Sequence, residues 1–327
     1  MQRNGPYAIG IDIGGTKIAV ALVNSAGKLC CSKKILTDLC LREDELLTKI
    51  ADIVNELIQS VQHEVLGIGL AAPGYVNPNS GIVEHAVNLN WKQVPVVHKL
   101  KRYLKYDLPV FLQRDTVAET LGEYYYGAAQ DCNDFIFLSI GTGLGAGGFS
   151  SGRLITGVNN LALEIGHLSL DLDGQKCNCG NKGCIETLLS GNGLMRNASQ
   201  LLGLSDENTS EEPGANLAQK LLKEFVETND PNGIFLIQQV SKALGITCAI
   251  LKTVLDPERI IIGGGLGREL FDVLVDRAKE EMQARTLAVN QKGIQFYKSS
   301  VESSAMGAAA MVWYFNNIDP KPQQFAE

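Results

Sequence analysis

The chain has 327 residues, 45% of them hydrophobic, which is enough for two hydrophobic cores because single domains usually span about 100–200 residues. A formal net charge of −7 and an isoelectric point near 5.3 exclude a general nucleic-acid binder, which needs a basic face, and no uninterrupted apolar run approaches the ~20 residues that span a membrane. The first residues show no basic segment followed by an apolar one, so we expect no signal peptide and a cytoplasmic protein whose thiols stay reduced.

The N-terminal third predicts a hairpin followed by alternating helices and strands. Apolar, β-branched residues over 7–13 and 18–23 flank the turn Gly14-Gly15-Thr16-Lys17, which is typical of a β-hairpin with a glycine-rich corner. Helical spacing of apolar residues follows over 43–62. Short buried strands are expected over 65–70 and 109–112, and a helix over 116–126.

The same pattern begins again in the middle of the chain. A strand is expected over 135–140, a corner at Gly141-Thr142-Gly143 and a returning strand over 148–155. Repetition of one supersecondary unit predicts two related halves that face one another. We therefore predict an α/β protein of two lobes, with its ligand in the cleft between them.

The remaining segments complete the second half. A polar surface loop is expected over 205–214, and helices over 216–228 and 233–255. A strand over 259–262 ends at Gly263-Gly264-Gly265, a last helix covers 305–315, and the tail beyond Asp319 should fray.

The glycine corners are candidates for phosphate binding, because glycine lets backbone N–H groups approach phosphate oxygens closely. The candidate nucleotide-binding residues are Gly14, Gly15, Thr16, Lys17, Gly141, Thr142, Gly143, Gly264 and Gly265. Asp12, at the end of the first strand, could hold Mg²⁺ through water. Ordinary turns are the alternative at each corner. A dinucleotide fingerprint at residues 141–145 is disfavoured, because it requires a helix where a strand is expected.

One histidine and three cysteines cluster between residues 167 and 184. His167, Cys177, Cys179 and Cys184 match the ligand set of a closed, structural Zn²⁺ site, with Gly180 and Gly183 permitting the bend. Reduced core cysteines or a redox pair are the alternatives. The other five cysteines, Cys30, Cys31, Cys40, Cys132 and Cys248, are expected in the core.

Several motifs together resemble the ROK family of bacterial repressors, open reading frames and sugar kinases. They are Asp12-Ile-Gly-Gly-Thr-Lys17, Ala72-Pro-Gly74, Asn88-Leu-Asn-Trp91, Glu164-Ile-Gly-His167 and Cys177-x-Cys-Gly-x-x-Gly-Cys184-x-Glu186. They occur in order over nearly the whole chain.

The resemblance implies a two-lobed actin-like, or ribonuclease H-like, ATPase fold, with ATP and Mg²⁺ as phosphoryl donor and a homodimer. We expect an N-terminal lobe over 1–125, completed by a C-terminal helix over 305–320, and a second lobe with the zinc loop over 126–304. The resemblance assigns Asp115 as the catalytic base. It also implies sugar contacts from Gly74, Asn88, Asp115, Glu164, His167 and Glu186, with His167 reaching both zinc and sugar.

Two residues depart from the family pattern. Arg114 replaces the Asn that precedes the catalytic Asp. If its side chain points into the cleft, it offers only donors to a sugar and should favour the charged form of Asp115; if it points away, the sugar loses one contact. Leu163 replaces a Gly before Glu164. Both changes concern the identity of the sugar more than the class of reaction, and we include Arg114 among the candidate substrate contacts.

The predicted function is ATP-dependent phosphorylation of a hexose, with glucose and glucose 6-phosphate as first choice of substrate and product. Fructose, mannose and N-acetylmannosamine remain alternatives. A sugar-binding regulator that has lost catalysis is another. A repressor of this family would carry an N-terminal helix-turn-helix domain, for which the strand expected from Tyr7 leaves no room, and we expect no nucleic-acid partner.

Overall fold

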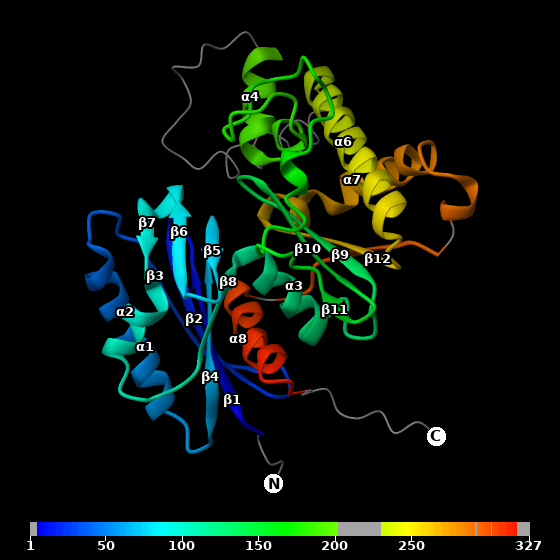
Figure 1. Ribbon diagram of the computed structural model, residues 1–327. Helices are drawn as coiled ribbons and strands as arrows, with labels where there is room; N and C mark the ends of the chain where they lie inside the picture. Colours follow the sequence, from blue (N-terminus) through cyan, green and yellow to red (C-terminus); the bar gives the residue numbers. More distant parts are fainter. Residues whose placement is uncertain (1–4, 202–229, 292, 302, 319–327) are drawn as a thin grey trace, which may run out of the picture. The chain divides into compact units, whose positions relative to one another are not determined.

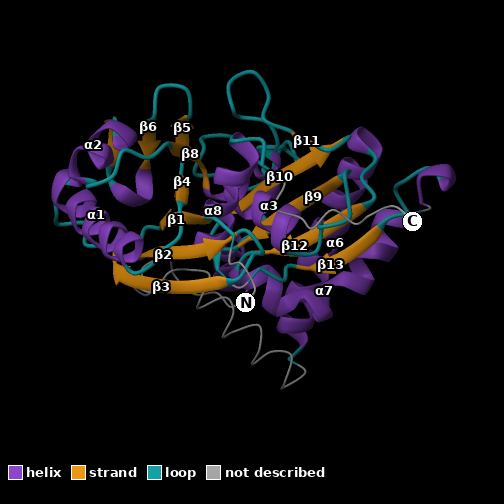
Figure 2. Cartoon of the chain, turned by 90° about the horizontal axis from the view of Figure 1, so that it is seen from below, coloured by secondary structure: helices purple, strands orange, loops and turns teal. Residues whose placement is uncertain are grey.

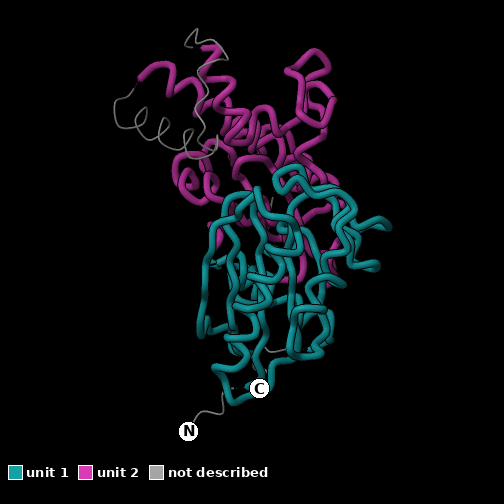
Figure 3. The backbone as a smooth tube through the Cα atoms, turned by 90° about the vertical axis from the view of Figure 1, so that its left-hand side faces the viewer, with its two compact units in different colours: residues 1–131, 156–161, 300–327 teal, residues 132–155, 162–299 magenta. Residues whose placement is uncertain are grey.

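The computed structural model describes residues 5–201, 230–291, 293–301 and 303–318. The chain forms two compact units, which Figure 3 shows in different colours. Unit 1 comprises residues 1–131, 156–161 and 300–327, and unit 2 comprises residues 132–155 and 162–299. The loop expected over 205–214, the helix expected over 216–228 and the tail beyond Asp319 lie outside the described residues.

Unit 1 contains a five-stranded sheet in the order β3-β2-β1-β4-β8 (Figures 1 and 2). Strands β1, β2 and β3 are antiparallel neighbours, whereas β4 and β8 run parallel to β1. The strands are β1 (Tyr7–Ile13), β2 (Lys17–Asn24), β3 (Leu29–Leu36), β4 (Val65–Ala72) and β8 (Val110–Arg114).

The rest of unit 1 surrounds this sheet. A small antiparallel sheet consists of β5 (Tyr75–Asn77), β6 (Ile82–Ala86) and β7 (Trp91–Val94), with a 3-10 turn over Val87–Leu89. The helices are α1 (Glu43–Gln59), α2 (Val96–Tyr103), α3 (Asp115–Tyr126) and α8 (Ser304–Phe315).

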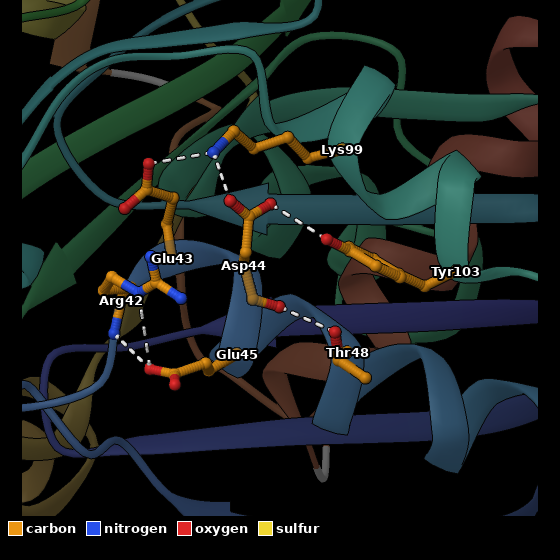
Figure 4. Close-up of polar contacts among 7 residues, drawn as sticks. All are labelled: Arg42, Glu43, Asp44, Glu45, Thr48, Lys99 and Tyr103. Carbon is orange, nitrogen blue, oxygen red and sulfur yellow. Dashed lines mark hydrogen bonds and ion pairs between the residues drawn. The ribbon is translucent and has the colours of Figure 1, made fainter.

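Polar contacts join the start of α1 to α2 (Figure 4). The Lys99 ammonium lies 2.9 Å from Glu43 and 3.0 Å from Asp44, and the Tyr103 hydroxyl donates to Asp44 at 3.0 Å. The carboxylates also lie at the N-terminus of α1, where negative charge is favourable. This network links the first turn of α1 to α2.

Helix α8 packs directly on the backbone of the large sheet. A Cβ atom added to Gly10 of β1 would lie 1.8 Å from the Ala305 carbonyl oxygen, and one added to Gly69 of β4 would lie 1.8 Å from that of Ala308. Only glycine at these two positions permits so close an approach. Small residues on both surfaces therefore set where the N-terminus of α8 lies.

Unit 2 repeats the sheet of unit 1 in the order β11-β10-β9-β12-β13. Again three strands are antiparallel neighbours and two are parallel to the first strand of the hairpin. The strands are β9 (Phe135–Ile140), β10 (Leu144–Ser150), β11 (Arg153–Leu154), β12 (Arg259–Gly263) and β13 (Gln295–Lys298). The predicted internal repeat is thereby confirmed.

The helices of unit 2 pack around its own apolar core. They are α4 (Gly191–Leu201), α6 (Pro231–Leu255) and α7 (Gly265–Gln283), with 3-10 turns over Ile165–His167, Ile185–Thr187 and Ala288–Gln291. Within the described ranges, α6 alone is long and apolar enough to cross a membrane, and 56% of its most apolar stretch is buried in the protein.

Two expectations about this architecture were wrong. The returning strand of the second hairpin begins at Leu144 instead of residue 148. Its first half is rich in glycine, which has a low strand propensity, so the sequence did not indicate a strand there. Packing requires glycine at residue 148, because a Cβ there would lie 2.5 Å from Ile136 Cδ1. Of the five other cysteines, only Cys132 and Cys248 are buried. Cys30, Cys31 and Cys40 are exposed, the first two because they lie on β3, an edge strand that the sequence analysis missed.

Candidate functional site

Unit 1 gathers the predicted carboxylates at one edge of its sheet. Asp12 is the penultimate residue of β1, and Asp115 directly follows β8. Only β4 separates these two strands, and neighbouring strands lie about 4.8 Å apart, so the two backbones are about 10 Å apart. All three strands are parallel. The carboxyl ends of parallel strands are where ligands bind in open α/β sheets.

Asp115 is the first residue of α3, and its carboxylate is held by the backbone. Oδ1 accepts a hydrogen bond from the Thr116 N–H at 2.7 Å. Burial raises the pKa of Asp115, whereas the Thr116 bond and the neighbouring Arg114 charge oppose this shift. A carboxylate with a raised pKa is a stronger base than an ordinary aspartate, which is what proton abstraction from a hydroxyl requires.

Arg114 is a buried residue, 5% exposed, and is not folded out onto the surface. Burial lowers its pKa, while Asp115 and Tyr75 act in the opposite direction. The expected effect of Arg114 on Asp115 is present, but burial of Asp115 outweighs it and the net pKa shift is upward.

Asp12 is held by a residue that the sequence analysis did not identify. The Ser304 hydroxyl, in the first turn of α8, donates to Asp12 Oδ2. Burial and the nearby Asp115 charge raise the pKa of Asp12 to about 6, against the Ser304 bond and Lys17. The sequence indicates Ser304 only indirectly. It begins a helix of small residues, and those small residues can pack closely on the glycines of β1 and β4.

The first glycine corner is a tight turn that Thr37 braces. The Gly14 N–H donates to the Lys17 carbonyl at 2.9 Å, and the Thr37 hydroxyl donates to the Gly14 carbonyl at 2.7 Å. Thr16 and Lys17 are exposed at its tip. Their side chains are therefore available as donors to an anionic ligand.

Glycines in unit 1 also bring candidate sugar residues close to this corner. A Cβ on Gly15 would lie 3.0 Å from Asn88 Cβ, so the corner packs against Asn88. Gly74 has a φ of +80°, and a Cβ there would lie 2.2 Å from the His85 carbonyl oxygen. Neighbouring protein atoms thus explain why both positions carry glycine, even without a bound ligand.

The second corner, in unit 2, is held by the start of α4. The N–H groups of Gly191 and Asn192 donate to the carbonyls of Gly141 and Thr142 at 2.8 and 3.2 Å. A Cβ on Gly143 would lie 2.7 Å from Glu186 Oε2, the same oxygen that accepts the Leu144 N–H at 3.0 Å. This corner and the candidate sugar carboxylate Glu186 are therefore direct neighbours.

The third glycine corner contains two glycines in different situations. Gly264 has a φ of +75°, and its Cβ would lie 2.4 Å from the Ile140 carbonyl oxygen, so glycine is required by packing. A Cβ on Gly265 would have no protein atom within 4 Å. Gly265 is the residue at this corner that a bound ligand could approach closely.

The predicted metal ligands come together in unit 2. The ligand atoms of His167, Cys177, Cys179 and Cys184 all lie within 4.8 Å of one another. His167 Nδ1 is 3.8 Å from Cys177 Sγ, and Cys179 Sγ is 3.6 Å from Cys184 Sγ. Zn–S bonds of about 2.3 Å in a tetrahedron separate two sulfurs by about 3.8 Å and a sulfur from a nitrogen by about 3.6 Å, so the cluster fits zinc.

The three thiols of the cluster differ in how readily they lose a proton. Burial and the neighbouring thiols raise the pKa of Cys184 to about 12, and burial raises the pKa of Cys177, whereas hydrogen bonds with the Asn181 backbone and the other two thiols outweigh burial and lower the pKa of Cys179. Metal ligation needs thiolates, so a bound divalent ion would displace the protons of Cys177 and Cys184.

The cluster lies beside both glutamates of the predicted sugar site. Cys177 Sγ is 3.8 Å from Glu186 Oε1, and His167 Nε2 is 4.0 Å from Glu164 Oε2. One ring nitrogen of His167 therefore faces the thiols and the other faces Glu164. Gly183, with a φ of +66°, is required in the loop because its Cβ would lie 1.7 Å from the Asp171 carbonyl oxygen.

The backbone before Glu164 is strained. Leu163 adopts a φ of +63°, a left-handed conformation that costs a non-glycine residue about 1–2 kcal/mol. Its side chain packs against the core of unit 2. Leu163, which stands where the family pattern has a Gly, therefore adopts a backbone conformation that favours glycine.

Comparisons with known proteins agree with these motifs. The ROK family pattern matches residues 8–314. A glucokinase of Halalkalibacterium halodurans is 30% identical over 311 residues, covering 91% of this chain and 92% of that protein.

Two solved structures extend the likeness to three dimensions. The crystal structure of a ROK family glucokinase from Streptomyces griseus, in complex with glucose and AMPPNP, matches with a TM-score of 0.74 at 29% identity, covering 93% of this chain and 98% of that one. A ROK family transcriptional regulator, a homolog of the E. coli MLC protein, matches with a TM-score of 0.81 at 25% identity, covering 94% and 78%. These likenesses confirm the predicted α/β, actin-like ATPase fold.

Proposed function

The chain belongs to the ROK family, and on that basis we propose that it is an ATP-dependent sugar kinase acting on a hexose, with glucose as the first candidate and glucose 6-phosphate as product. The observation that carries the proposal is Asp115, a carboxylate at the carboxyl edge of a parallel sheet whose pKa is raised by burial. Glucokinases among the similar proteins support the same class of substrate.

In the proposed reaction Asp115 accepts the proton of a sugar hydroxyl as its oxygen attacks the γ-phosphorus of ATP. The new bond joins the sugar oxygen to phosphorus, and the bond to the β,γ-bridging oxygen breaks, leaving ADP. The remaining task of the protein is to position the reactants and neutralise charge.

The nucleotide phosphates are assigned to the glycine corners. Gly14, Gly15, Thr16 and Lys17 would serve from unit 1, and Gly141, Thr142 and Gly143 from unit 2. Gly265, which has no protein atom near its Cβ direction, would face the adenosine with Gly264. Asp12 would hold Mg²⁺ through water, and that ion supplies neutralisation of the phosphate charge.

The acceptor sugar is assigned to Gly74, Asn88, Arg114 and Asp115 of unit 1, and to Glu164, His167 and Glu186 of unit 2. The cluster of His167, Cys177, Cys179 and Cys184 would hold one structural Zn²⁺, which orders the loop carrying Glu186. The contacts between this cluster and both glutamates support that arrangement.

The second candidate is a sugar-responsive regulator without catalysis. The high structural similarity to a ROK transcriptional regulator favours it, as does Arg114 in place of Asn. The presence of both Asp12 and Asp115 favours the kinase. A cytoplasmic homodimer is the expected setting for either function.

A panel of hexoses tests the proposal. The purified protein, with ATP and Mg²⁺, should release ADP in the presence of glucose, mannose, fructose or N-acetylmannosamine, with the highest kcat/KM for glucose. Sugar binding by calorimetry without ADP release for any member of the panel would instead support the regulator.

A further inference from the structure

One row of the unit 1 sheet carries polar side chains on the face that α8 covers. Asp12, Ala71 and Gln113 are register partners on β1, β4 and β8. Partners in a parallel sheet point to the same face. Asp12 contacts Ser304 of α8, so the Gln113 side chain lies on the α8 face too.

The adjacent row confirms which face this is. Gly10, Gly69 and Phe111 are also register partners, two residues earlier on the same strands. Both glycines lie against carbonyl groups of α8, and the Phe111 ring stacks on Phe315 near the end of that helix with centroids 5.6 Å apart. Helix α8 thus runs along this face with its N-terminus at the Asp12 row.

Gln113 is a buried polar residue that the proposed mechanism does not use. Its side chain is 3% exposed, and Oε1 has no hydrogen-bond partner among the residues that the structure describes. Burying such an oxygen unsatisfied costs about 1–3 kcal/mol. An orphaned group in a native protein often marks a site for an ordered water or ion.

The surroundings of Gln113 select the kind of ligand. Ala71, the residue between Gln113 and Asp12, has only a methyl side chain. Asp12 is fixed by Ser304, and Asp115 is close enough to influence it electrostatically. Oxygen acceptors around a carboxylate suit a hydrated Mg²⁺, which keeps several waters whose hydrogens need acceptors.

We propose that Gln113 and Ser304 are positioning residues for the hydrated magnesium ion of the nucleotide. Ser304 fixes the Asp12 carboxylate, and Gln113 Oε1 accepts a hydrogen bond from a metal-bound water. The inference rests on the nucleotide assignment made above. Magnesium binding, assigned above to Asp12 alone, would thus involve two further residues that are 191 positions apart in the sequence.

Calorimetric titration with ADP, in the presence and absence of Mg²⁺, tests this role without relying on turnover. The wild type should bind ADP more tightly with Mg²⁺ than without it. Gln113→Leu and Ser304→Ala should each reduce that preference by about fivefold, the equivalent of one hydrogen bond of about 1 kcal/mol, and leave affinity for metal-free ADP unchanged. Ser303→Ala is the matched control, because the adjacent Ser303 makes no side-chain capping bond.

Thermal unfolding separates this role from a structural one. Gln113→Leu removes an unsatisfied oxygen, so its melting temperature should stay the same or rise while the magnesium preference falls. A lowered melting temperature with equal loss of affinity for both forms of ADP would overturn the inference, and an unchanged preference in one variant would remove that residue from the role.

Failure of the proposed kinase function and failure of the magnesium inference give different results. A wild type that prefers magnesium-bound ADP but phosphorylates no hexose would refute the kinase assignment and leave the inference standing. A wild type without magnesium preference would overturn the inference, whether or not it phosphorylates a sugar.

Discussion

Replacing Asp12 with Asn should stabilise the protein while removing its proposed activity. Burial and the nearby Asp115 charge raise the pKa of Asp12 from 3.8 to about 6. The folded protein therefore binds more protons than the unfolded chain between these pH values, so Asp12 lowers stability as pH rises through this window. Above pH 6 the full cost of the charge is about 3 kcal/mol, and the neutral Asn can still accept from Ser304.

The assay is thermal unfolding between pH 4 and 8 without Mg²⁺ or nucleotide. At pH 8 the Asp12→Asn variant should melt about 6–12 °C above the wild type, given about 3 kcal/mol and about 2–4 °C per kcal/mol for a unit of this size. The difference should shrink below pH 6 and vanish near pH 4. Asp52→Asn, an exposed carboxylate of α1, is the control and should change little. A variant that melts at or below the wild-type temperature at pH 8 would refute the reasoning.

Three further outcomes follow from the site. Metal analysis should find one zinc per chain, and Cys179→Ser should lose it together with stability and sugar affinity; a metal-free protein of full activity would contradict this. Arg114→Asn should change the ratio of kcat/KM between hexoses, and so their ranking, by about tenfold, or ~1.4 kcal/mol. The reason is that a buried side chain with donors only is replaced by one that also accepts hydrogen bonds. An unchanged ranking would place Arg114 outside the sugar site. Leu163→Gly should raise the sugar KM, because it loosens the backbone before Glu164. The melting temperature should change little, since relief of the left-handed conformation offsets the lost packing of the leucine side chain. A large loss of stability with unchanged KM would give Leu163 a purely structural role.

The sequence predicted the repeated hairpins because their signals are local. Apolar runs ending at glycine corners occur twice, and each becomes the first hairpin of a five-stranded sheet. The edge strand β3 was missed because most of its residues are exposed, so it carries no clear apolar alternation. The clustering of His167, Cys177, Cys179 and Cys184 was predictable because the four residues lie within 18 residues of sequence.

Contacts between distant segments were the part that the sequence could not supply. Ser304 and Asp12 are 292 residues apart, and they meet only because α8 packs on Gly10 and Gly69. From the sequence, the corner glycines were expected either to admit a phosphate or to form ordinary turns. In the structure a Cβ at Gly15 would meet Asn88 and one at Gly143 would meet Glu186, so substituting either glycine would disturb residues proposed for the sugar and residues proposed for the nucleotide together.

The central claim is that Asp115 accepts the proton of a hexose hydroxyl during transfer from ATP. The most direct measurement is transfer of labelled γ-phosphate from ATP to glucose by the wild type and by Asp115→Asn, with glucose affinity measured by calorimetry for both. We expect labelled glucose phosphate from the wild type, and a variant that binds glucose with similar affinity but turns over about 10²–10⁴ times more slowly. Turnover of the variant within a few-fold of the wild type would contradict it.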